Sequence, residues 1–361
     1  MNRRTVLTTA GAAAVIGVAG YWRQVRTVEL YDATAAAARA PMDLAASGPE
    51  RLAELVRMAT LAPNSHNTQA WTFTSLPDGI RIAVDTTRRT PVVDPDDHHL
   101  YVSLGAAVET LIIAATAYGV TATPKIAADG TVTLTFADGA APSPFLSAIT
   151  LRQSHRGLYD GTALTDADRA ALTVDPALRL IEDAATRTAL RDLTVAAYGA
   201  QMEDAAYRAE LKSWLRFSQG AALETADGLF SGCSGSPALP QMLGENLFGA
   251  LVTAKGQSEA LAAQIDSSPA LALLVTDPDT PTGRIETGRR LARIGLAATA
   301  QGLAMAHTNP ALENPEGRAE AAQICGVTSG RPSLLLRLGR TSAPLPYSLR
   351  RPTAQTLLTP R

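Results

Sequence analysis

The stretch Leu61-Ala62-Pro63-Asn64-Ser65-His66-Asn67-Thr68-Gln69-Ala70-Trp71 decides how the remaining chain is interpreted. It follows residues 50–59, whose apolar residues recur at the three/four spacing of one buried helix face, and it precedes a predicted strand. Its amides and hydroxyls offer hydrogen-bond donors and acceptors without an obligatory charge. Such a turn can bind the edge of a flat heteroaromatic ring, although proline and asparagine also simply end helices in ordinary loops.

The order of residues in this stretch resembles the Pro-Ser-Ser-x-Asn-x-Gln-Pro-Trp loop of the nitroreductase-like flavoprotein family. In that family the loop lies against the isoalloxazine ring of FMN. Here Asn64 replaces the first serine and Ala70 replaces the second proline. The resemblance implies that FMN is the cofactor and that the loop binds it through Pro63, Asn64, Ser65, Asn67 and Gln69.

The segment from Arg152 to Asp160 resembles the family's opening Arg-Arg-Ser-x-Arg-x-Phe motif. Guanidinium forks and a hydroxyl suit the phosphate, the C2 carbonyl and N1 of FMN. The resemblance therefore adds four cofactor-binding residues, which are Arg152, Gln153, Ser154 and Arg156. Taken alone, two arginines near a helix start more often form a solvated or salt-bridged face.

Two segments near the C-terminus extend the resemblance. A predicted buried strand at residues 333–339 leads to Arg350-Arg351-Pro352, which resembles the family's closing phosphate-binding element. One of Arg350 and Arg351 is expected to reach the phosphate. After a predicted helix at residues 286–303, His307 and Thr308 stand where the family places a backbone amide near flavin N5, although its usual Glu-Gly pair is absent.

Composition and charge exclude several classes of function. The chain has 361 residues, a net charge of -2 and no Lys/Arg-dense tract with interleaved aromatics, so no nucleic-acid partner is predicted. The run from Asp94 to His99 has the residue types of a metal site. However, adjacent histidines on a helix point about 100 degrees apart, and no spaced third ligand follows. We therefore expect no metal, and we expect the aspartates to cap a helix.

The N-terminus has the layout of an export signal. Arg3 and Arg4 directly precede the uncharged stretch from Val6 to Gly20, which indicates the twin-arginine route for residues 1–22. The export machinery carries folded proteins with their cofactors, so a periplasmic or cell-envelope location is expected. Trp22 and Arg23 also suit an uncleaved membrane anchor. Residues 23–47 are Ala-rich and are predicted to be a linker or a helical arm.

Strands and helices alternate along the chain, which predicts an α+β fold. Residues 71–74 and 80–84 read as a hairpin, and residues 131–136 as a further strand. The helical patterns of residues 103–120 and 286–303 align, with Gly105 matching Gly288 and Gly119 matching Gly302. This internal repeat predicts two nitroreductase-like halves, residues 48–150 and 151–361, that pack through these helices. The chain then resembles the fused Acg-type branch of the family, a dimer within one polypeptide that is expected to be a monomer.

The Gly-, Ser- and Pro-rich segment from Gly228 to Gly256, here called the cover segment, is predicted to be irregular. The resemblance to the fused branch implies that it lies over the flavin as a lid. Two functions are consistent with these features. The first is an FMN-dependent oxidoreductase that passes a hydride or electrons from flavin N5 to a nitro, quinone or related acceptor, with NAD(P)H as one candidate donor and no catalytic side chain. The second is a flavin-binding or storage protein whose closed cover prevents turnover. Loss of the flavin is a third alternative.

Overall fold

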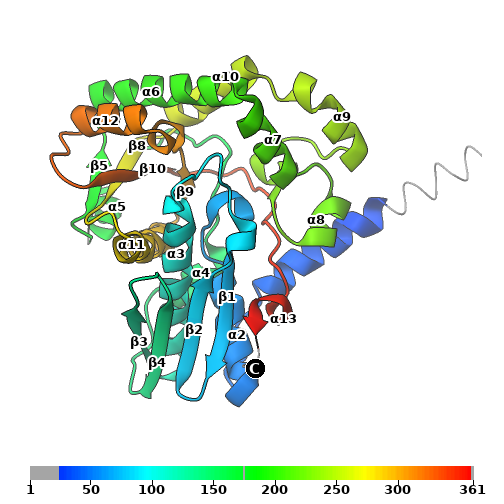
Figure 1. Cartoon of the computed structure of the whole chain (residues 1–361), viewed down its shortest axis with the longest axis vertical. Helices are drawn as coiled ribbons and strands as arrows, with labels where there is room; N and C mark the ends of the chain where they lie inside the picture. The colour runs from blue at the N-terminus through cyan, green and yellow to red at the C-terminus, as the bar shows by residue number, and fades with distance from the viewer. Residues whose placement is uncertain (1–23, 174, 359–361) are drawn as a thin grey trace, which may run out of the picture.

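The computed structural model describes residues 24–173 and 175–358 and has the α+β architecture that the sequence predicts (Figure 1). The predicted export signal lies outside the described residues. Residues 24–38 form a helix, so this part of the predicted linker or arm is a helical arm. This helix packs through Tyr31 and Ala35, one turn apart, onto Phe230 and Leu349.

The first sheet has five strands in the order β11-β1-β2-β4-β3. All neighbours are antiparallel except β11, which runs parallel to β1. Phe73 and Ile82 face helices α2 and α3 in the core of this half, whereas the polar residues between them lie nearer the surface. The elements of this half are α2 (Gly48–Thr60), β1 (Trp71–Leu76), β2 (Gly79–Val84), α3 (His98–Ala115), β3 (Val120–Ile126), β4 (Val132–Asp138), α4 (Leu146–Leu151) and, from the chain end, α13 (Thr353–Thr356) and β11 (Leu357–Leu358).

The second sheet has four antiparallel strands in the order β5-β8-β10-β9. Along β8, Ala272 and Leu274 face α11 while Leu271 and Leu273 face the outer helices, because side chains of a strand alternate between its two faces. Both faces are buried, which explains the continuous apolar runs in the sequence. The elements are α5 (Asp166–Leu172), β5 (Leu178–Ile181), α6 (Ala184–Glu203), α10 (Ala254–Asp266), β8 (Ala270–Thr276), α11 (Pro281–Ala300), β9 (Ala304–His307), α12 (Pro315–Ile324) and β10 (Arg331–Gly339).

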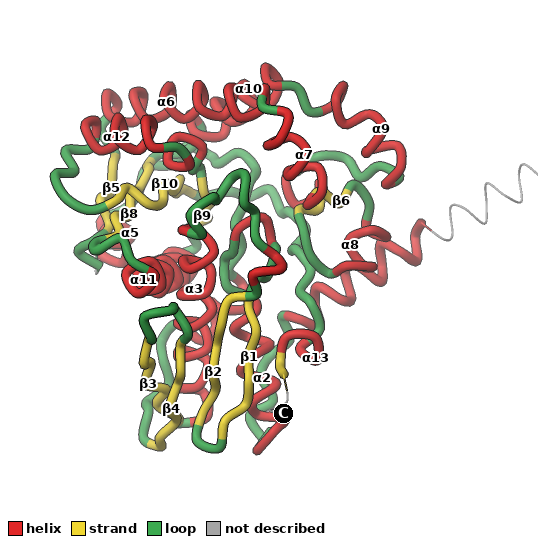
Figure 2. The backbone as a smooth tube through the Cα atoms, in the orientation of Figure 1, coloured by secondary structure: helices red, strands yellow, loops and turns green. Residues whose placement is uncertain are grey.

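Helices α3 and α11 lie between the two sheets and pack closely against each other (Figures 1 and 2). A Cβ atom at Gly105 would lie 1.9 Å from the carbonyl oxygen of Ile285, and one at Gly288 would lie 1.9 Å from that of Val102. The contact is reciprocal, since each glycine meets the residue three positions before the other glycine. The prediction that these two helices pack through their small residues is confirmed.

The two sheets share one topology. Apart from β11, two strands of each sheet precede the central helix and two follow it, and the fourth of these strands lies between the second and the third. Each central helix ends before a left-handed glycine, Gly119 with φ 70° and Gly302 with φ 72°. Helix α3 together with the 3-10 turn that follows it, residues 98–118, is long and apolar enough to cross a membrane. Most of this stretch is buried inside the protein, so its apolar composition is that of a core helix.

The connection between β5 and β8 holds the elements that cover one end of the molecule. It contains α7 (Ala205–Trp214), α8 (Gln219–Thr225), the short strand β7 (Leu229–Phe230), a 3-10 turn (Ser231–Ser234) and α9 (Gln241–Leu251). The prediction of an irregular cover segment is therefore wrong beyond residue 240, where α9 and the start of α10 are helical. Gly244 lowers the helix propensity of α9, but it is required there because a Cβ atom would lie 2.2 Å from the ring of Phe217.

Candidate functional site

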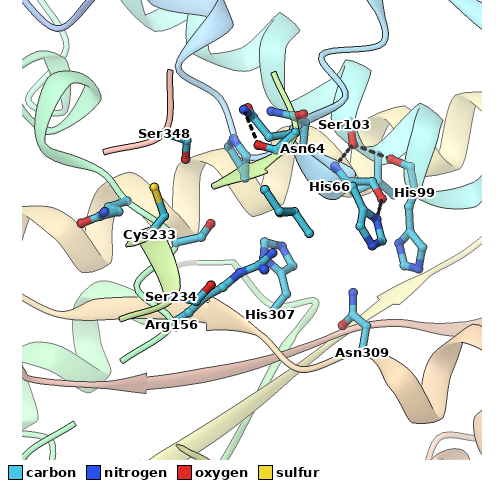
Figure 3. A pocket seen from close by; sticks show the side chains of 18 of the residues that line it. Asn64, His66, His99, Ser103, Arg156, Cys233, Ser234, His307, Asn309 and Ser348 are labelled. Carbon is cyan, nitrogen blue, oxygen red and sulfur yellow. Dashed lines mark hydrogen bonds between the residues drawn. The ribbon is translucent and has the colours of Figure 1, made fainter. Parts of the chain in front are cut away.

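A cavity of about 240 Å³ lies where the two halves meet the cover segment (Figure 3). Its wall combines the predicted polar loop, the N-terminal end of α3, the segment after α4, and the end of β9 with the 3-10 turn that follows it. The first residues of the cover segment, Gly228 to Ser234, close it from one side. Figure 3 shows Cys233 and Ser348 toward one side of this cavity and His66, His99 and Asn309 toward the other.

The polar loop from Pro63 to Gln69 has an unusual backbone. His66, Asn67 and Gln69 all adopt left-handed conformations, with φ of 47°, 52° and 52°. Non-glycine residues rarely do so, and such strain persists only where the surroundings hold it in place. Three left-handed residues within four positions, at the wall of a cavity, indicate a functional site.

Hydrogen bonds from distant segments hold the loop in this shape. The Asn67 amide nitrogen donates to the carbonyl oxygens of Gly228 at 3.0 Å and Leu349 at 3.2 Å, while its oxygen accepts from Arg350 at 3.0 Å. The Gln69 side chain donates to the Ala226 carbonyl and accepts from the backbone of Arg351, both at 2.8 Å. The polar loop, the cover segment and the C-terminal segment are thus tied together beside the cavity.

Three buried or half-buried arginines form what we call the cationic end of the cavity. Arg152 donates to the Leu61 carbonyl oxygen at 2.8 Å, and its other terminal nitrogen is buried without a partner. Arg39, from the N-terminal arm, donates to the Thr150 carbonyl oxygen at 2.8 Å and stacks 3.8 Å above the Tyr347 ring. Arg350 donates to Asn67 and to backbone carbonyls.

None of these three guanidinium groups pairs with a carboxylate in the described part of the chain. Burial, and then repulsion from Arg39, lowers the pKa of Arg152 to about 9. Burial likewise lowers the pKa of Arg39 to about 10, and burial followed by repulsion from Arg39 and Arg152 lowers the pKa of Arg350. Buried charges are normally paired, so an uncompensated cluster of this kind is a site for an anion.

Arg156 and three histidines occupy the middle and the opposite side of the cavity. The Arg156 side chain is exposed to the cavity, and it has no hydrogen-bond or ion-pair partner among residues 24–358 that the structure describes. Burial lowers the pKa of both His66 and His307 to about 3, and the charge of Arg156 adds to this effect in each case. Burial also lowers the pKa of His99. The three imidazoles are therefore neutral at pH 7 and can both donate and accept hydrogen bonds.

The structure brings most of the predicted cofactor-binding residues to this one cavity. Those that line it are Pro63, Asn64, Ser65, Asn67, Arg152, Gln153, Ser154, Arg156, His307 and Arg350. Gln69, Thr308 and Arg351 do not line it. Gln69 is fully buried and supports the loop. Thr308 is also buried, and its backbone N–H donates to the carbonyl oxygen of Leu335. The Arg351 guanidinium donates to the carbonyl oxygens of Gln69 and Gln355. Of the two C-terminal arginines, Arg350 is the one at the cavity.

The acidic run before α3 acts as predicted in capping the helix. The carboxylate of Asp94 accepts from the backbone N–H groups of His99 and Leu100, at 3.0 and 2.9 Å. His99 lines the cavity, whereas the buried His98 lies 3.8 Å from Asp279. Among the described residues no group of three or more His, Cys, Asp or Glu side chains is arranged to hold a metal ion. His155, which lies within the second motif, is buried away from the cavity and contacts the Ala343 carbonyl oxygen.

Sequence reasoning missed several residues of the cavity wall. Arg39 lies in an Ala-rich run without a motif, and only its four-residue spacing from Ala35 and Tyr31 could have indicated that it shares their buried helix face. Tyr198, Tyr207 and Glu313 also line the wall. The first two belong to α6 and α7 and the third to a 3-10 turn, and no local pattern distinguishes them from ordinary helix residues.

Comparisons with known proteins agree with this site only in general terms. No family model matches the chain. Two proteins of Mycobacterium tuberculosis, each named "Putative NAD(P)H nitroreductase", are 25% identical over 328 residues; one is from strain H37Rv and the other from strain CDC 1551. The match covers 85% of this chain and 91% of each relative.

Solved structures give a weaker likeness. A nitroreductase with bound FMN from Desulfitobacterium hafniense is 17% identical, covers 58% of this chain and 95% of its own, and has a TM-score of 0.35. The FMN-dependent nitroreductase NfnB from Mycobacterium smegmatis in complex with NADPH is 16% identical, covers 54% of this chain and 86% of its own, and has a TM-score of 0.33. Scores of this size do not establish how the structures correspond.

Proposed function

We propose that this protein is an FMN-binding oxidoreductase of the nitroreductase type. The observation that carries the proposal is the cationic end, where Arg39, Arg152 and Arg350 line one cavity and none of them pairs with a carboxylate among the described residues. A phosphate group would neutralise these charges and fill the empty hydrogen-bonding capacity of the buried Arg152 nitrogen. The names of the mycobacterial relatives support the same assignment.

The remaining wall of the cavity fits the other parts of FMN. Asn64, Ser65 and His66 from the polar loop and His307 from the end of β9 present neutral polar groups to the interior. Neutral donors and acceptors suit the uncharged edge of an isoalloxazine ring, whereas a carboxylate or a second cation there would have to be desolvated. When bound, FMN supplies the hydride and electron transfer, and the protein contributes binding, orientation and electrostatics.

The residues of this chain favour the flavin in its anionic reduced form. Arg152 and Arg156 bring positive charge to the cavity, and Arg156 has no competing partner in the described chain. Fixed cations near a developing negative charge stabilise it strongly, because little water is present to screen them. The nitro, quinone or related acceptor and the NAD(P)H donor are part of this proposal.

One observation favours the alternative, a flavin-binding protein without turnover. The cover segment is held over the cavity by hydrogen bonds between Asn67 and Gly228 in both directions. The volume of about 240 Å³ lies slightly below the range of about 300–1,000 Å³ that is usual for ligand sites. A flavin would leave little space for a second molecule unless the cover segment opens.

Two measurements test these functions. The purified protein should be yellow and release FMN on denaturation, and colourless protein that does not take up added FMN would refute both versions. Anaerobic addition of NADPH should then bleach the flavin absorption if the protein turns over. Persistent colour with NADPH, together with bleaching by dithionite, would support storage and contradict the oxidoreductase.

We also propose that the chain consists of two tandem repeats forming an intramolecular pseudo-dimer. The common strand order of the two sheets and the reciprocal contacts of Gly105 and Gly288 support this, because reciprocal contacts arise from two-fold symmetry. A pseudo-dimer buries its own central helices and should be a monomer. Light scattering coupled to size-exclusion chromatography would show this, and a stable dimer would contradict it.

Export by the twin-arginine route completes the proposal. The adjacent Arg3 and Arg4 before an apolar stretch support it, as does the need to load a flavin before translocation. Replacing both arginines by lysine should leave the protein in the cytoplasm of the producing cell. An unchanged distribution between cytoplasm and envelope would contradict this route.

A further inference from the structure

The end of the cavity beneath α6 and α7, here called the donor end, has a different character from the cationic end. It is formed by Tyr198, Tyr207, Asn309 and Glu313. Glu313 lies in the 3-10 turn Pro310–Glu313, which packs against α6. Nothing in the sequence motifs or in the cationic end accounts for a carboxyl group at the wall of this cavity.

The surroundings of Glu313 contain no cation paired with its carboxyl group in the described chain. One carboxyl oxygen accepts from the Gln201 amide of α6 at 2.6 Å, and the other has no partner among the described residues. The titratable groups that face it are Tyr198 on α6, Tyr207 and Glu210 on α7, and Asp94 before α3. Burial, and then the charges of Asp94 and Glu210, raises the pKa of Glu313 to about 7 although Gln201 opposes the shift.

Two neighbours add hydrogen-bond donors at the same end. The Asn309 side-chain oxygen accepts from the backbone N–H of Leu335 at 2.9 Å, which leaves its amide nitrogen for the cavity. The Tyr207 hydroxyl has no hydrogen-bond partner among the described residues, and burial raises its pKa, so it keeps its proton. A ligand that reaches this end therefore meets O–H and N–H groups, and the nearby cation is Arg156, whose charge acts on both Tyr198 and Tyr207.

We propose that the donor end binds the carbonyl edge of an uncharged planar ring, with the carboxyl group of Glu313 donating a hydrogen bond to a carbonyl oxygen. This inference rests on the proposed function, since the ring is either the flavin itself or a quinone-type acceptor beside it. Both sources share the same chemistry, a carbonyl oxygen that accepts but carries no charge. The cationic end selects the anionic group of the ligand, and the donor end selects its neutral ring.

The proposal has a direct consequence for binding at different pH values. A carboxylic acid donates to a carbonyl oxygen, whereas a carboxylate repels it, so the ligand binds the protonated form of Glu313. Binding is then strongest below the pKa of about 7 and falls by up to tenfold per pH unit above it. Between pH 6 and pH 8.5 the dissociation constant should rise by roughly 30-fold if the ionised form does not bind.

The experiment measures this dependence with two probes. Lumiflavin, the ring without a phosphate, is titrated into flavin-free protein, and menadione is titrated into FMN-loaded, oxidised protein without a reductant, each at pH 6 and pH 8.5. The ring of the flavin is the source if only lumiflavin loses affinity at pH 8.5. A quinone-type acceptor is the source if only menadione does.

Two variants assign the effect to Glu313. Glu313→Gln keeps a donor at every pH, so the affinity should change by less than about threefold between pH 6 and pH 8.5. Glu316→Gln is the matched control, because Glu316 is exposed on α12 and does not line the cavity, and it should keep the full dependence.

Clear results would overturn the inference. Equal affinity of both probes at the two pH values in the unmodified protein would do so, and this outcome does not depend on whether a variant folds. Retention of the pH dependence in Glu313→Gln would do so as well. If FMN is retained at pH 7 in either case, only this inference fails, whereas protein that binds neither FMN nor lumiflavin at any pH refutes the proposed function itself.

Discussion

Replacing Arg152 by methionine should stabilise the flavin-free protein while weakening its binding of FMN. The Arg152 side chain is 4% exposed, and burial together with Arg39 lowers its pKa to about 9. Relative to an arginine in water, this corresponds to a penalty of roughly 5 kcal/mol for holding the charge in the folded protein. Methionine removes the penalty and retains much of the apolar volume.

The gain is reduced by what the substitution removes. The hydrogen bond to the Leu61 carbonyl oxygen is worth about 1.5 kcal/mol or more, and local relaxation already lowers the real cost of a buried charge. A net stabilisation of about 1–3 kcal/mol remains, which raises the melting temperature by about 1–4 °C for a chain of this size. Without the charged hydrogen bonds to the phosphate, FMN should bind about 10- to 150-fold more weakly.

The assay is thermal unfolding of the flavin-free protein in a buffer without phosphate, together with a fluorescence titration of FMN. Arg81→Met is the matched control, since Arg81 is exposed on β2, and it should change neither quantity. A lower melting temperature of flavin-free Arg152→Met would show that the charge is compensated in the fold. Unchanged FMN affinity would show that the phosphate binds elsewhere.

Further predictions concern the packing, the cover segment and the imidazoles. Gly105→Leu should destabilise the protein by at least about 3 kcal/mol, because the leucine side chain would overlap the backbone at Ile285. Urea unfolding measures this change in the free energy of unfolding. A decrease of less than about 1 kcal/mol would contradict the close packing of the two helices. The carboxylate of Asp227, directly before the cover segment, accepts from Arg88 and Arg216, and Asp227→Asn weakens both ion pairs. This variant should release FMN several-fold faster in a stopped-flow measurement. An unchanged rate would show that these pairs do not hold the cover segment. Burial lowers the pKa of His66 and His307 in the folded protein to about 3, so the unfolded chain binds protons first as the pH falls below about 6.5. Urea unfolding should therefore show about 1–2 kcal/mol less stability per histidine at pH 5 than at pH 7.5. Equal stability at the two pH values would contradict their burial as neutral groups.

Local patterns in the sequence predicted the elements that have strong periodicity or distinctive turns. The hairpin of β1 and β2 follows from alternating apolar residues around a Pro-Asp-Gly turn. The packing of α3 on α11 followed from two aligned glycines, since only a residue without a side chain permits that approach. In each case the physical cause lies within a few neighbouring residues or in a repeated pattern.

The parts that could not be predicted depend on contacts between distant segments. Arg39 reaches the cavity because the arm docks through Tyr31, whose hydroxyl donates to the Tyr347 carbonyl oxygen at 2.7 Å across more than three hundred residues. The pKa of Glu313 is raised because other elements bury it and, secondly, because Asp94 and Glu210 face it from distant parts of the chain. The helix α9 was missed because Gly244 lowers local propensity, and its packing against Phe217 is a tertiary effect that outweighs propensity.

The way these segments meet explains why the site contains strain and uncompensated charge. The polar loop contributes Asn67 in a left-handed conformation, and the cover segment and the C-terminal segment both accept from its amide. Arg350 donates to the oxygen of the same Asn67 side chain. The loop and the Arg350 guanidinium therefore hold each other in position. Groups fixed in this way need no rearrangement when an anion arrives, and the free energy that the empty site costs is recovered when the charge is neutralised. The arrangement therefore favours a ligand that carries a phosphate at the cationic end and an uncharged ring at the donor end, because neither group alone would satisfy both.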